Sequence, residues 1–99
     1  MPTTTQSWSY DDDRCCCEEF IKYYIISPGN MPLDRLTKSI NARLPHLKVS
    51  SVRAKLQNIQ AICQELKIAN HCPAQPSPHY SAQNYQAMLD ALNAYGIKY

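Results

Sequence analysis

The stretch 44–59 constrains the fold of this chain more than any other, because it ends one helix and begins another. Pro45 lacks a backbone N–H and restricts the residue before it, so a preceding helix must end just ahead of it. A helix then starts after Ser50 or Ser51. Its apolar residues recur at spacings of three and four, the pattern of one buried helical face: Val52, Leu56, Ile59, Cys63 and Leu66.

Capping residues and apolar periodicity predict three further helices. Ser9 followed by Asp12 favours the start of a first helix, because each can cap the backbone of the other. Pro32 suits the first position of a second helix, and Ser81 and Gly96 suit the two ends of a fourth. The predicted helices cover about residues 10–26, 32–44, 51–66 and 82–95. No alternating strand pattern occurs, so the sequence predicts an all-α fold.

The predicted organisation is one domain, since 99 residues suffice for one modest core. Residues 1–7 are polar and expected to be disordered. Residues 8–67 form a three-helix unit. Residues 68–79 hold three prolines, which exclude regular structure and indicate a loop. Residues 80–99 supply a C-terminal helix that packs on the same domain.

Composition predicts a cytosolic protein that is neither an enzyme nor a cofactor carrier. The first residues resemble no secretory leader, and no apolar run is long enough to cross a membrane. The five cysteines then indicate free thiols in a reducing compartment. Three of them are consecutive (Cys15–Cys17), and successive helical residues diverge by about 100°, so we expect no metal site. Only two glycines are present, so no glycine-rich phosphate loop exists, and no histidine has an oriented catalytic partner.

The face opposite the apolar stripe of the third helix carries polar and small residues. They are Ser50, Arg53, Ala54, Gln57, Asn58 and Ala61, with Lys55 on a flank. Arg, Gln and Asn have forked donors and acceptors that match guanine and adenine edges in the DNA major groove. The predicted base contacts are Arg53, Gln57 and Asn58, with Ser50 beside them; the predicted phosphate contacts are Lys38, Arg43, Lys48 and Lys55. A merely solvated face of a packed helix has the same pattern.

The charge distribution supports the same region. Residues 1–30 hold two basic and five acidic side chains, a net charge of −3, whereas residues 31–67 hold seven basic and two acidic ones, a net charge of +5. A basic centre of this kind attracts phosphate. A dipolar surface without any partner would have the same distribution.

Two segments resemble the Myb/SANT repeat. Residues 8–13, Trp-Ser-Tyr-Asp-Asp-Asp, are similar to the opening of such a repeat, and residues 44–56 are similar to its leucine–proline turn and third helix. The resemblance covers about residues 8–60. It implies three helices packed around spaced tryptophans, with Trp8 as the first and Leu56 in place of the third. It also implies that the third helix enters the DNA major groove as a helix-turn-helix variant.

The sequence therefore predicts a small protein that binds double-stranded DNA, of a kind suited to transcription regulation. A homodimer or a protein partner is expected, because one three-helix unit with few basic groups binds weakly. The alternative is a protein-binding adaptor or inhibitor, such as a phage-encoded anti-defence protein, acting on a nucleic-acid-handling complex. Its basic face would then meet acidic protein, or acidic residues of the first helix would mimic phosphate: Asp11, Asp12, Asp13, Glu18 and Glu19.

Overall fold

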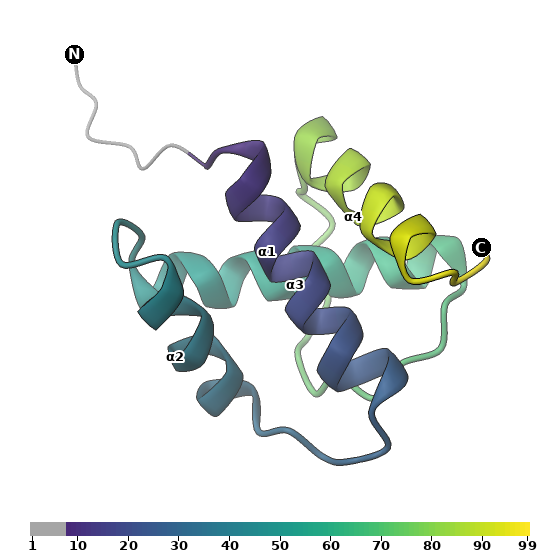
Figure 1. Ribbon diagram of the computed structural model, residues 1–99, viewed down its shortest axis with the longest axis horizontal. Helices are drawn as coiled ribbons and strands as arrows, with labels where there is room; N and C mark the ends of the chain where they lie inside the picture. The colour runs from purple at the N-terminus through teal and green to yellow at the C-terminus, as the bar shows by residue number, and fades with distance from the viewer. Residues whose placement is uncertain (1–7) are drawn as a thin grey trace.

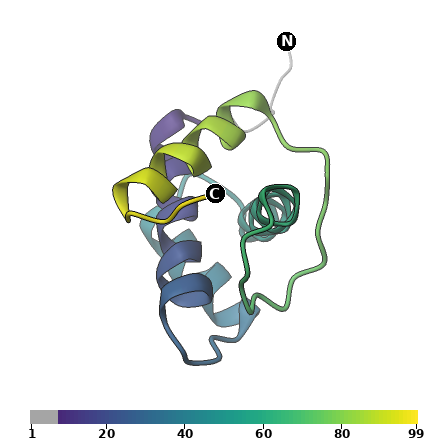
Figure 2. The ribbon, with the colours of Figure 1, turned by 90° about the vertical axis from the view of Figure 1, so that its right-hand side faces the viewer.

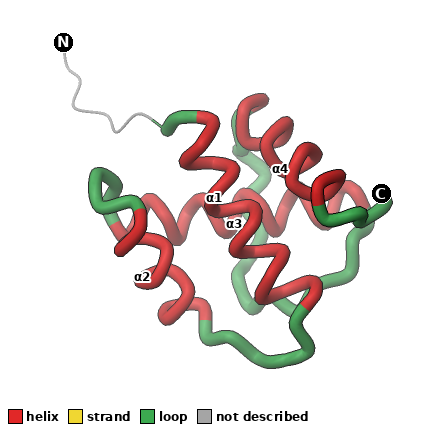
Figure 3. Tube along the Cα trace, in the orientation of Figure 1, coloured by secondary structure: helices red, strands yellow, loops and turns green. Residues whose placement is uncertain are grey.

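The computed structural model describes residues 8–99, and the disorder expected for residues 1–7 lies outside the described part. The described chain is helical without strands (Figures 1 and 3), which confirms the predicted all-α class. Its elements are α1 (Tyr10–Phe20), a π-helical segment η1 (Ile21–Ile26), α2 (Leu33–Arg43), α3 (Val49–Leu66) and α4 (Ala82–Ala94). None of these helices is long and apolar enough to traverse a bilayer.

The long helix α3 lies across the molecule and organises the packing (Figure 1). α1 packs against α3 and most extensively against α4, while α2 packs chiefly against α3. Every helix supplies fully buried side chains to one core: Phe20, Ile21, Tyr24, Leu36, Ile40, Val52, Leu56, Ile59, Ile62, Met88 and Leu92. The C-terminal helix is therefore part of the same domain as the first three.

Ser9, Ser81 and Gly96 act as the sequence predicts, whereas Pro32 precedes α2 as its N-cap and is not its first helical residue. The Ser9 hydroxyl accepts a hydrogen bond from the Asp12 backbone N–H at 3.0 Å, and the Asp12 carboxylate accepts one from the Ser9 N–H at 3.1 Å. Ser81 caps α4 by accepting from the Asn84 N–H at 3.0 Å. Gly96 has φ +70°, the left-handed conformation that closes a helix at low cost for glycine.

The first helical stretch ends at Ile26, as expected, but its last six residues form π-helix. The Ser27 N–H donates to the Lys22 carbonyl, five residues back, at 3.1 Å. This wider turn keeps Ile21 and Tyr24 fully buried while Ile26 is 54% exposed.

The loop between α3 and α4 encloses α3. Figure 2 looks nearly along α3 and shows residues 67–81 passing on the side away from α1. Consequently the part of α3 beside this loop has protein on both sides.

Candidate nucleic-acid interface

The turn between α2 and α3 is held by three contacts. The Asn41 side chain donates to the Leu47 carbonyl at 2.7 Å, and the Leu47 N–H donates to the Leu44 carbonyl at 3.0 Å. Leu47 itself is buried in the core. The His46 ring lies 3.0 Å from the Asp12 carboxylate, so the turn is also joined to the start of α1. These contacts fix the direction in which α3 leaves α2.

α3 begins earlier than predicted. Its cap is Lys48, whose extended backbone (φ −83°, ψ 148°) precedes Val49 and whose carbonyl accepts from the Ser51 and Val52 N–H groups. The prediction of a cap at Ser50 or Ser51 is wrong, because neither serine caps the helix. Both lie inside its first turn, where Ser50 is exposed.

The start of α3, defined as residues 49–54, presents part of the predicted face to solvent. Ser50, Arg53 and Ala54 are exposed, as is the capping Lys48. Arg53 extends toward α2, where its guanidinium lies 3.9 Å from the Asp34 carboxylate. A bond of that length between two half-exposed groups holds the arginine weakly. The start of α3 is therefore available to a partner.

Lys55 does not lie on this surface, contrary to the prediction. Its side chain is 11% exposed, and its ammonium lies 2.8 Å from the Asp13 carboxylate, which is fully buried. The same ammonium stands 4.5 Å from the centre of the Trp8 ring. A lysine beside an apolar stripe can extend its stem through the core, and here α1 supplies the opposite charge. Lys55 is thus a structural residue and contacts no phosphate in this conformation.

The loop 67–81 covers the rest of the predicted face. The Asn58 amide donates to the Ser77 carbonyl at 2.9 Å, and the Ser77 N–H donates to the Gln57 carbonyl at 3.0 Å. One turn further, Gln60 donates to the Cys72 carbonyl at 3.0 Å, and Ala61 is only 8% exposed. Residues 50–61 therefore do not form one exposed surface. Asn58 is committed to the loop, and Gln57 is half-buried at its edge.

Positive charge is concentrated around the start of α3, the part of the predicted face that the loop 67–81 leaves exposed. Residues 33–54, called the α2–α3 unit below, carry five basic side chains and one acidic one, a net charge of +4, against −2 for the rest of the chain. The basic residues are Arg35, Lys38, Arg43, Lys48 and Arg53, all of them exposed. Arg43 is bound by Glu19 of α1 at 2.9 Å. Arg35 was not among the predicted contacts, although its place in this basic run was a signal for it.

The acidic side chains of α1 are mostly engaged within the protein. Asp13 pairs with Lys55, Glu18 with Arg14, and Glu19 with both Arg43 and Lys22. Burial alone would raise the pKa of Asp12, but hydrogen bonds from His46 and Ser9 outweigh it and lower that pKa below its ordinary value. These carboxylates neutralise basic side chains of the same protein, so the arrangement does not favour α1 as a phosphate mimic.

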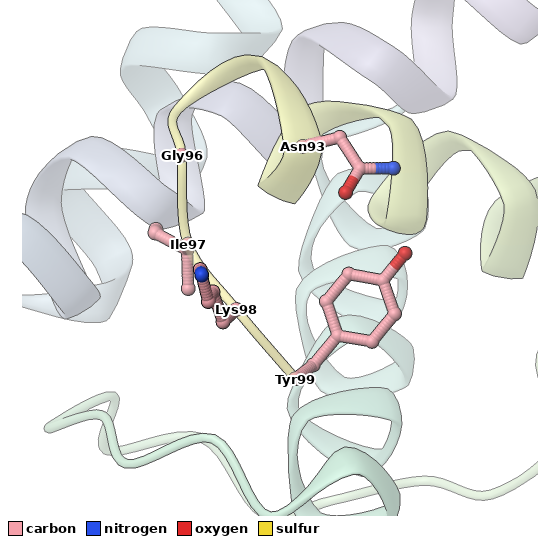
Figure 4. Close-up of a pocket in the computed structure, with 5 residues that line it drawn as sticks. All are labelled: Asn93, Gly96, Ile97, Lys98 and Tyr99. Atoms are coloured by element: carbon pink, nitrogen blue, oxygen red, sulfur yellow. The ribbon is translucent and has the colours of Figure 1, made fainter.

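The remaining chemistry-bearing groups are dispersed. No set of three potential metal ligands converges within residues 8–99. Burial raises the pKa of the Cys63 thiol to about 12 and also raises the pKa values of Cys16 and Cys17, which disfavours their reactive thiolate forms. A pocket of about 350 Å³ lies between the end of α4 and the last residues of the chain, with Asn93 and Tyr99 among its walls (Figure 4). It is an open surface depression.

Comparisons with protein-family models, with curated proteins and with solved structures find no match for this chain.

Proposed function

We propose that this protein binds double-stranded DNA through the α2–α3 unit. The observation that carries the proposal is the coincidence of three properties at the start of α3: an exposed helix surface, a rigidly held turn before it, and the local net charge of +4. Helix-turn-helix proteins read base edges with the N-terminal residues of their second helix. The resemblance of residues 8–60 to a Myb/SANT repeat supports the same assignment.

In this proposal the side chains divide by the groups they meet. Arg53 contacts a base edge, because its forked guanidinium matches guanine O6 and N7. Lys48 and Lys38 contact phosphates on either side of the groove, and Arg43 joins them if DNA draws it away from Glu19. Ser50 is exposed in the first turn of the same helix. Gln57 reaches the edge of the contact, whereas Lys55 and Asn58 take no part in it.

The test is fluorescence anisotropy with a pool of random-sequence DNA duplexes at several salt concentrations. Binding should weaken steeply as salt rises, because each phosphate contact releases a condensed cation. Lys48→Ala should lower the slope of log affinity against log salt by about one. The matched control is Lys98→Ala, another exposed and unpaired lysine, one residue before the end of the chain. Figure 1 shows the C-terminus at the end of the molecule opposite the α2–α3 turn.

A second measurement examines base contact. Duplexes enriched by selection on the wild-type protein should bind Arg53→Ala more weakly by about 1–3 kcal/mol. The thermal melt of that variant should stay unchanged, since Arg53 is exposed. The proposal fails if the wild-type protein binds no duplex at low salt. A basic surface that meets acidic protein would then be the better interpretation.

A further inference from the structure

Val49 is an apolar side chain in the middle of a charged surface. Four large hydrophobic residues are exposed in the described chain, Ile26, Val49, Tyr95 and Tyr99, and Val49 is the one that belongs to the α2–α3 unit. It is the first residue of α3 and is 43% exposed. Because the helix begins at Val49 rather than after the serines, this side chain comes directly beside the predicted DNA contacts.

Val49 and Arg53 occupy the same face of α3. They are four residues apart, and side chains at that spacing are neighbours on a helix. The helix rises about 6 Å over four residues, and successive nucleotides of one strand are about 3.4 Å apart along the DNA axis. Two side chains so placed reach base pairs that are one or two steps apart.

We infer that Val49 reads the C5-methyl group of thymine, next to a guanine that Arg53 contacts. The inference rests on the proposed DNA binding and gives it a substrate class. The thymine methyl is the apolar group that a standard base pair presents in the major groove, and small apolar side chains pack against it. The exposed Ser50 between them discriminates little, because a hydroxyl bonds to either donors or acceptors. The preferred duplex therefore places a T·A pair within one or two steps of a G·C pair.

Replacing thymine by uracil tests this inference, because uracil lacks only the methyl group. Duplexes selected on the wild-type protein are copied with dTTP or with dUTP, and anisotropy gives the two affinities. Loss of one buried methyl should weaken wild-type binding about threefold to fourfold. Val49→Ala has a shorter side chain that makes less contact with the methyl group, so it should lose most of this preference for the thymine copy. Val49→Thr is the matched control, since it keeps the branched shape and one methyl group and should still prefer the thymine copy.

Each result decides something. Equal binding of the two copies by the wild-type protein overturns the inference while leaving duplex binding intact. An equal thymine preference in the wild type and in Val49→Ala also overturns it, because another side chain must then contact the methyl. Failure of the wild-type protein to bind any duplex at low salt removes the proposed function itself. Retained helical circular dichroism in Val49→Ala shows that the variant is folded.

Discussion

The two halves of α3 have the same periodicity in sequence but opposite environments in the structure. In residues 49–54 the side chains of Ser50 and Arg53 are exposed, whereas residues 55–63 are all buried or half-buried. The second half contacts the core on one side and the loop 67–81 on the other. Three polar side chains there, Lys55, Asn58 and Gln60, hold the fold together. A polar helical face is thus open to a partner only where no distant segment covers it.

The largest expected effect is a difference in stability between variants of two cations of α3, Lys55 and Arg53. Lys55→Ala should reduce the free energy of unfolding by about 3–5 kcal/mol, because the fully buried Asp13 loses the cation that neutralises it at 2.8 Å and keeps only the hydrogen bond from the Gln83 amide. Arg53→Ala, two residues away, should change stability by less than about 0.5 kcal/mol. Urea unfolding followed by circular dichroism measures both. Equal effects would mean that the boundary between the two halves is drawn in the wrong place.

Local sequence signals predicted the fold well. The caps at Ser9 and Ser81 and the stop before Pro45 depend on residues within one helical turn, and the structure has each of them. The candidate site was predicted less well. The residues placed wrongly, Lys55 and Asn58, contact partners that are distant in the sequence. Asp13 lies 42 positions before Lys55, and Ser77 lies 19 positions after Asn58. A helical wheel of α3 contains neither.

The loop contact gives the next largest effect. Gln60→Ala should cost about 1–3 kcal/mol, because the buried carbonyl of Cys72 loses its donor at 3.0 Å. Limited proteolysis should then cut within residues 72–79 faster than in the wild type. The matched control is Gln64→Ala, one turn further along α3, where the side chain is exposed. An unchanged rate of cleavage for Gln60→Ala would contradict the view that the loop is fastened to α3.

The contact between Asp12 of α1 and His46 of the α2–α3 turn predicts that the stability of the protein depends on pH. The pKa of Asp12 is lowered in the folded protein, so the unfolded state binds more protons just below the ordinary aspartate pKa of about 4. The stabilisation by ionised Asp12 is complete above that pH and is lost as the pH falls through the lowered folded value. Stability curves of Asp12→Asn should lack this part of the acid loss. If the stability of the two proteins falls in parallel with pH, the contact between Asp12 and His46 does not cause the acid loss.

The smallest expected effect concerns Asp34, the single acidic residue of the α2–α3 unit. Its carboxylate lies 3.3 Å from the Lys38 ammonium and 3.9 Å from the Arg53 guanidinium, two of the cations proposed to contact DNA. Asp34 is 65% exposed, and such a pair contributes at most about 1 kcal/mol.

Asp34→Asn should therefore leave stability almost unchanged and raise the affinity for random duplexes about twofold to fourfold at low salt. The gain should shrink as salt rises, because the removed charge acts through solvent. Glu65→Gln is the matched control. It removes the same charge from the far end of α3, and glutamine can still accept the hydrogen bond from Tyr80. Equal gains in the two variants would indicate an effect of net charge alone, and the start of α3 would lose its special place in binding. A gain confined to Asp34→Asn would identify Arg53 and Lys38 as the cations that meet the duplex.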